Sequence, residues 1–173
     1  PVLEQDSENP TQKKASDRHN QVVLEILSDF VRTAPSLAKI MATDDITDKL
    51  LSFVFNGTNK SSEKASILLH NIIALQDDVK SNQKLFLAAS NHLIERFPDF
   101  CSFVEKEGKH ISSRSRAMEI IIYLISKMAT IPDSVISLCK FLSTQVFLQP
   151  VQSFLHVDFF NLFTSICDKT NII

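Results

Sequence analysis

One apolar spacing occurs four times along the chain. Its positions follow the i, i+3, i+4, i+7 rule, which places the side chains on one face of a helix. Successive copies start 42, 52 and 42 residues apart. The four sets are Val23, Ile26, Leu27, Phe30 and Val31; Ala65, Leu68, Leu69, Ile72 and Ile73; Ala117, Ile120, Ile121, Leu124 and Ile125; and Phe159, Leu162, Phe163, Ile166 and Cys167. The pattern predicts four amphipathic helices with related roles in the fold.

The second copy also contains a recognisable sequence motif. Ala65-x-x-Leu68-Leu69-His70-Asn71-Ile72 resembles the signature in the third helix of an armadillo repeat, and Ile46-Thr-Asp-Lys-Leu50-Leu51 resembles the second helix of that repeat. A period of roughly 40–47 residues is typical of armadillo and HEAT units. The resemblance covers residues 44–84 and is only positional elsewhere. It implies an all-α fold, a right-handed α-solenoid of three to four units. Helical bundles and VHS-type superhelices show similar periodicity and stay open as alternatives.

The composition favours helices over sheets. The chain has 173 residues, of which 44% are hydrophobic, with two glycines and no tryptophan. A chain of this size can bury one core as a single domain. The net charge of −2, without a basic stripe, argues against a nucleic-acid partner. No apolar run is long enough for a transmembrane helix, so we expect no membrane partner.

The ends of the chain differ in character from its middle. Residues 1–18 are polar and predict a flexible leader, followed by one domain over 19–173 whose first helix runs from 19 to 33. Because the chain begins at Pro1, we expect a fragment of a longer protein. Cys101, Cys139 and Cys167 lie in apolar surroundings and indicate reduced thiols, hence an intracellular protein of the cytoplasm or nucleus.

No motif for catalysis or metal binding is evident. Glycine occurs only at positions 57 and 108, so there is no phosphate-binding glycine loop. The five histidines show no metal-ligand spacing with each other or with cysteines. We therefore expect a protein that is not an enzyme and that needs no cofactor or metal.

The armadillo resemblance also implies a binding groove. In that family the third helices line the concave face, where an asparagine bonds the main chain of an extended peptide and a tryptophan four residues earlier stacks beside it. Asn71 matches the asparagine. The equivalent positions of the asparagine are held by Asp29, Tyr123 and Ser165, and those of the tryptophan by Glu25, Ile67, Glu119 and Asn161. The absence of tryptophan argues against import-signal recognition of the importin-α kind.

The chemistry of these positions suggests a kind of partner. An asparagine amide both donates and accepts hydrogen bonds, which matches a peptide backbone. Glu25, Asp29 and Glu119 make the face acidic in places and favour a partner with Lys or Arg. The alternative is that these residues are solvated polar positions on amphipathic helices.

A basic cluster forms a second candidate site. It consists of Lys106, Lys109, His110, Arg114 and Arg116. Serines lie among these residues at the start of a predicted helix, a position that attracts acidic or phosphorylated ligands. The alternative is that the cluster is only solvated charge.

Together these features predict a protein-interaction scaffold or adaptor that binds an extended or helical segment of a partner, or of its own parent chain. A structural or oligomerisation module is the first alternative, with the aromatic stretch from Phe147 to Phe163 mediating self-association. A VHS-like superhelix that reads short linear motifs is the second.

Overall fold

The computed structural model describes residues 10–78, 91–106, 111–148 and 153–170. All regular secondary structure in these ranges is helical, which confirms the all-α prediction. The labelled helices are α1 (Pro10–Thr33), α2 (Pro35–Met41), α3 (Asp44–Asn56), α4 (Asn59–Asp78), α6 (Phe97–Glu105), α7 (Ile111–Lys127), α8 (Asp133–Leu148) and α9 (Ser153–Thr170). No described helix is both long enough and apolar enough to cross a membrane.

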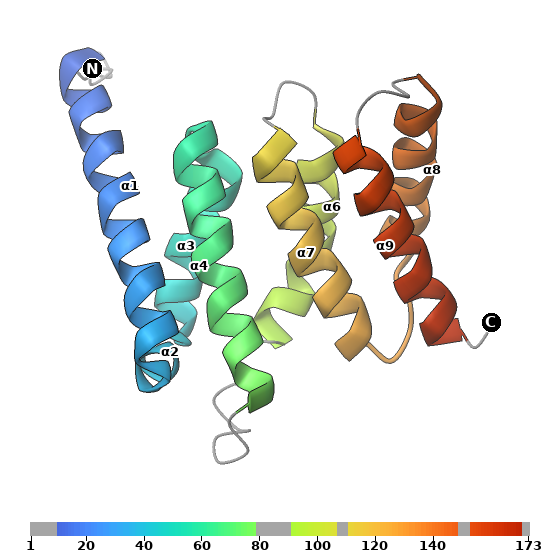
Figure 1. Ribbon diagram of the computed structural model, residues 1–173, viewed down its shortest axis with the longest axis horizontal. Coiled ribbons are helices and arrows are strands. Elements are labelled where there is room, and N and C mark those ends of the chain that lie inside the picture. The colour runs from blue at the N-terminus through green and yellow to red at the C-terminus, as the bar shows by residue number, and fades with distance from the viewer. Residues whose placement is uncertain (1–9, 79–90, 107–110, 149–152, 171–173) are drawn as a thin grey trace, which may run out of the picture.

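The helices form two layers (Figure 1). The front row consists of α1, α4, α7 and α9, which run in the same direction and pack side by side in chain order. Behind them lie α2, α3, α6 and α8, and the pairs α3–α4, α6–α7 and α8–α9 join the two layers. The front-row helices are the four that carry the repeated apolar spacing, so helices with the same sequence pattern occupy equivalent places in the row.

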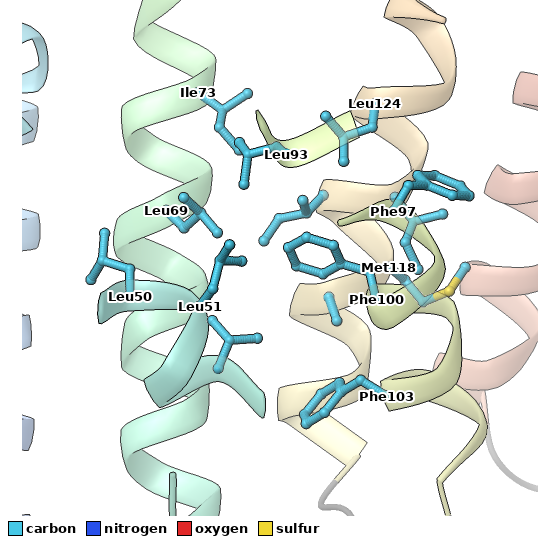
Figure 2. Close-up of a cluster of buried hydrophobic side chains, with 14 of the residues drawn as sticks. Leu50, Leu51, Leu69, Ile73, Leu93, Phe97, Phe100, Phe103, Met118 and Leu124 are labelled. Atoms are coloured by element: carbon cyan, nitrogen blue, oxygen red, sulfur yellow. The ribbon is translucent and has the colours of Figure 1, made fainter. Parts of the chain in front are cut away.

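The core lies between the two layers. In Figure 2, Leu51 of α3 and Leu69 of α4 point towards Phe97 and Phe100 of α6. The ring of Phe55 contacts that of Phe100 edge to face, with 5.0 Å between the ring centres. Full burial of one such side chain contributes about 1.5–3 kcal/mol to stability. This shared core holds the front row at a fixed spacing.

The first helix begins earlier than the sequence predicts. α1 starts at Pro10, inside the segment predicted as a leader, whereas the predicted start is residue 19. Asp17 explains the extension, because its carboxylate accepts hydrogen bonds from Thr58 Oγ1 at 3.0 Å and from Ser61 Oγ at the start of α4. These polar contacts join α1 to α4 where apolar residues are few. Residues 1–9 of the predicted leader lie outside the described ranges.

The repeated apolar positions are not buried equally in the four copies. In α4 and α7 all five positions are buried. In α1, by contrast, Val23, Ile26 and Phe30 are exposed, and so is Phe163 in α9. The prediction of one common core face therefore holds for the two interior helices and only in part for the two end helices, which among the described residues have a front-row neighbour on one side.

Candidate functional site

The eight residues predicted to line a groove lie on the front row, two on each helix. The pairs on α7 and α9 come together around one hollow. Glu119 and Tyr123 of α7, with Asn161 and Ser165 of α9, line a space of about 770 Å³ between these two helices. The fold explains why these four residues lie around one hollow. The two residues on each helix are four positions apart and so share a helical face, and α7 and α9 are parallel neighbours.

The walls of this hollow combine apolar and polar groups. Ile122 and the exposed ring of Phe160 provide apolar surface. Lys169 spans the hollow and donates a hydrogen bond from Nζ to the carbonyl oxygen of Ser126, at 3.2 Å. The ring of Tyr123 lies 5.1 Å from the ammonium group of Lys127, which favours a fixed position of the ring through a cation–π contact.

A second hollow of about 640 Å³ continues from the first towards the start of α7. The two share Glu119, Ile122 and Asn161, so we treat them as one α7–α9 groove. The charged side chains that line the groove are Glu63, Arg116, Glu119, Asp158, Asp168 and Lys169. Carboxylates outnumber cations in this set, so the groove is acidic overall.

Asp158 is the functional candidate that sequence reasoning missed. It lies on the buried face of α9, lines the groove, and accepts a hydrogen bond from Ser115 Oγ at 3.1 Å. Burial raises the pKa of Asp158, and the hydrogen bond from Ser115 and the nearby arginines oppose that rise only in part. The available signal was its spacing of four residues from the buried Leu162, which places a carboxylate on an apolar face.

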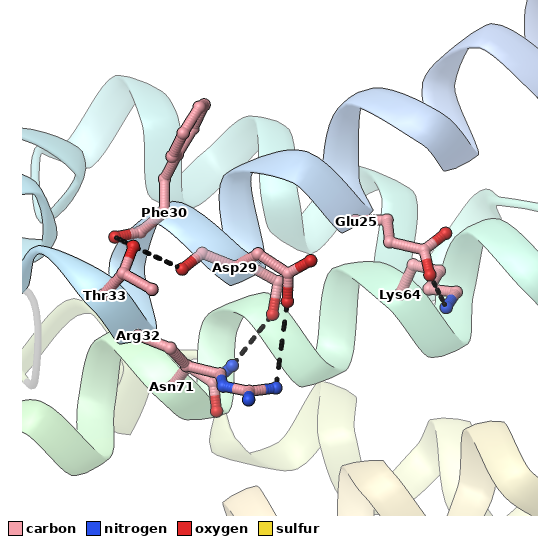
Figure 3. A network of polar contacts seen from close by, with 8 residues as sticks. Glu25, Asp29, Phe30, Arg32, Thr33, Lys64 and Asn71 are labelled. Atoms are coloured by element: carbon pink, nitrogen blue, oxygen red, sulfur yellow. Dashed lines mark hydrogen bonds and ion pairs between the residues drawn. The ribbon is translucent and has the colours of Figure 1, made fainter.

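The four predicted groove residues on α1 and α4 are placed differently. Asn71 donates a hydrogen bond from Nδ2 to Ser28 Oγ at 2.8 Å, which links α4 to α1. Figure 3 shows the neighbouring ion pairs, Glu25 with Lys64 at 3.1 Å and Asp29 with Arg32 at 3.8 Å. Ile67 is half-buried on α4. These polar groups bond to one another, and none of the four residues lines the α7–α9 groove.

The two asparagines therefore differ in what they can offer a ligand. One amide N–H of Asn71 is occupied by Ser28. Asn161 is exposed and lines both parts of the groove, and its side chain makes no hydrogen bond with another described residue. Its amide is available to donate to and accept from a ligand.

The predicted basic cluster does not converge on one site within the described residues. Arg114 points towards α8, with its guanidinium 5.3 Å from the centre of the Phe141 ring, and burial lowers the pKa of Arg114. Arg116 points into the groove and pairs with Glu119 at 2.7 Å. Lys106 is exposed at the end of α6, and Lys109 and His110 lie outside the described residues. Arg114 and Arg116 are two positions apart on α7, and side chains at that spacing point to different sides of a helix, so the two arginines point in different directions.

Cys101 and Cys139 are poorly suited to nucleophilic chemistry. Cys101, Cys139 and Cys167 are free, and burial raises the pKa of Cys101 to about 12 and also raises that of Cys139. The thiolate is the reactive form of cysteine, so a raised pKa suppresses attack at neutral pH. In the described ranges, no three His, Cys, Asp or Glu side chains gather as metal ligands.

Comparison with models of known protein families, with curated proteins and with solved structures gave no match to this chain. The armadillo resemblance thus stays a prediction that depends on the residues quoted for it.

Proposed function

We propose that the chain is a short right-handed α-solenoid of the armadillo or HEAT kind. Three hydrogen bonds across the front row support this proposal: Asn71 with Ser28, Ser115 with Asp158, and Lys169 with Ser126. Each joins residues 43 positions apart. An offset shared by the first and the last front-row pairs is what stacked units of roughly 40–47 residues produce, and the bond from Ser113 to Asn59 between α4 and α7 spans 54 positions, in line with the longer spacing between those two copies.

The proposed role is that of a non-catalytic scaffold, which binds an extended segment of a partner protein in the α7–α9 groove. The observation that carries this role is the convergence of Glu119, Tyr123, Asn161 and Ser165 on one hollow of about 770 Å³. Its volume is within the range of roughly 300–1,000 Å³ found for ligand pockets. The amide of Asn161 and the hydroxyl of Ser165 can bond a peptide main chain, and Tyr123 and Phe160 can contact apolar side chains.

The charge of the groove indicates which segment fits. Because carboxylates outnumber cations along it, a segment with Lys or Arg is attracted, and one with Asp or Glu is repelled. Most of these charges are partly exposed, so added salt weakens the attraction by screening. We therefore expect a basic partner segment whose affinity falls as salt concentration rises.

A peptide-display selection against the wild-type chain tests the proposal. Selected peptides are synthesised, and their dissociation constants are measured by fluorescence anisotropy for the wild type, Asn161→Ala and Tyr123→Ala. We expect Lys- and Arg-rich peptides and a loss of affinity of about tenfold or more for each variant, the size of an ordinary interface hot spot.

Asp29→Ala is the matched control, since Asp29 was also predicted as a groove residue but lies outside the α7–α9 groove. Its affinity should stay within about twofold of the wild type. The groove assignment is wrong if all three variants bind the peptides as the wild type does, or if Asp29→Ala loses as much affinity as Asn161→Ala. Circular dichroism of each variant verifies that folding is retained.

A further inference from the structure

The exposed apolar residues of α1 correspond to residues that are buried elsewhere in the row. We define the leading positions as the first, second and fourth of the repeated spacing. In α4 (Ala65, Leu68, Ile72) and α7 (Ala117, Ile120, Leu124) no leading residue is more than 3% exposed. In α1 the leading residues are Val23, Ile26 and Phe30, exposed by 38%, 47% and 53%.

Hydrogen bonds locate what covers the leading face in the interior. Ser61, one turn before the leading residues of α4, bonds to Asp17 of the preceding helix α1. Ser113, in the same place on α7, donates to the carbonyl oxygen of Asn59 in α4 at 2.8 Å. The leading face therefore packs against the preceding front-row helix. α1 has no preceding helix among the described residues, and its leading face is left open.

The opposite end of the row shows the complementary pattern. We define two trailing positions in each helix. One is the residue that directly follows the first position of the repeated spacing, and the other is the third position of that spacing. They are occupied by Ser66 and Leu69 in α4, by Met118 and Ile121 in α7, and by Phe160 and Phe163 in α9. In α4 and α7 these residues are at most 2% exposed, because the following helices cover them, whereas Phe160 and Phe163 are 67% and 53% exposed.

We propose that copies of this chain associate head to tail, with the leading face of α1 in one copy packed against the trailing face of α9 in the next. Each face lacks the neighbour that the other face supplies. Because the front-row helices run in the same direction (Figure 1), α1 of the second copy follows α9 as α9 follows α7. The contact continues an interface type that already occurs three times within the chain.

The second layer also exposes large apolar side chains on the helices that pack against α1 and α9. Ile40 on α2, which packs on α1, is 65% exposed, and Phe147 on α8, which packs on α9, is 84% exposed. The contact joins two different faces, so each added copy leaves one of each open, and association produces chains of increasing length. The trailing face and the groove share Phe160, which lines the groove as well as being exposed on α9.

Sedimentation velocity and light scattering over a wide concentration range test the proposal. The wild type should grow with concentration beyond the mass of a dimer. Phe30→Asp removes the leading face and Phe163→Asp the trailing face, and Phe163 does not line the groove. Each variant alone should be monomeric, with association weakened at least about tenfold by the buried charge.

An equimolar mixture of the two variants is the decisive sample. It should form a discrete dimer, because the intact trailing face of Phe30→Asp meets the intact leading face of Phe163→Asp and no further copy can join. A wild type that stays monomeric throughout, single variants that still dimerise, or a mixture that stays monomeric would each overturn the proposal.

Ile111→Asp is the control for these measurements. Ile111 is an exposed isoleucine of the interior helix α7, so this variant should associate as the wild type does. If Ile111→Asp also failed to associate, the weaker association of Phe30→Asp and Phe163→Asp would be due to added charge in general. That result would overturn the assignment of the two faces. All substituted residues are exposed, and circular dichroism should show unchanged helical content.

Discussion

The hydrogen bond between Asn71 and Ser28 allows a test of whether Asn71 stabilises the fold or binds a ligand. Ser28 is buried, and Asn71 Nδ2 lies 2.8 Å from its hydroxyl oxygen. Asn71→Ala removes the bond and leaves a buried hydroxyl with one partner fewer. The bond contributes about 0.5–1.5 kcal/mol and an unsatisfied buried group costs about 1–3 kcal/mol. We expect Asn71→Ala to reduce the free energy of unfolding by about 2 kcal/mol.

The assay is urea and thermal unfolding of Asn71→Ala, Ser28→Ala and the double variant. For a chain of this size, about 2 kcal/mol corresponds to a fall in Tm of about 4–8 °C. The double-mutant cycle should give a coupling energy of about 1 kcal/mol between the two residues. Asn161→Ala, which breaks no described hydrogen bond, should change stability by less than about 0.5 kcal/mol.

The opposite result would refute this reasoning. If Asn71→Ala unfolds like the wild type but loses affinity for selected peptides, Asn71 serves a ligand as the armadillo resemblance implies. A coupling energy near zero would likewise show that the bond to Ser28 contributes nothing to the joint between α1 and α4.

Three further predictions follow from the polar and buried groups. Asp17→Ala should release the first turns of α1 from α4, because Thr58 and Ser61 lose the carboxylate that accepts their hydrogen bonds. The rate of amide hydrogen exchange over residues 10–20 should then rise at least about tenfold. An unchanged rate would show that these contacts do not hold α1. The pKa of Asp158 is raised above 3.8, so its protonated form stabilises the fold fully below about pH 4, and this contribution is lost as pH rises through the folded-state pKa. Asp158→Asn should therefore gain stability relative to the wild type between pH 4 and pH 7 in thermal melts, and a constant difference would contradict the buried carboxylate. Burial raises the pKa of Cys101 to about 12, so iodoacetamide at pH 8 should alkylate it only as fast as the chain unfolds, as read by peptide mass spectrometry.

Local sequence patterns predicted the features that depend on helical periodicity. The four spaced segments are the four front-row helices, and the residue pairs at i and i+4 on α7 and α9 do share a groove. These outcomes need only that equivalent helices lie parallel in chain order. Features that depend on distant polar contacts were not predictable in the same way. Asp17 extends α1 through residues more than 40 positions away, and the spacing that puts Asp158 on an apolar face does not reveal its hydrogen bond from Ser115, 43 positions earlier.

Val23, Ile26 and Phe30 are exposed, although residues at the same positions of the repeated apolar spacing are buried in α4 and α7. A repeated apolar spacing specifies which face of a helix prefers to leave water, but the free energy is gained only when another helix covers that face. In α4 and α7 the cover comes from both front-row neighbours. The same spacing on α1 and α9 is only partly covered within the described residues, so part of each apolar face stays in water. The exposed faces of α1 and α9 thus follow from the repeated spacing, and they are the two faces that the proposed head-to-tail contact would cover.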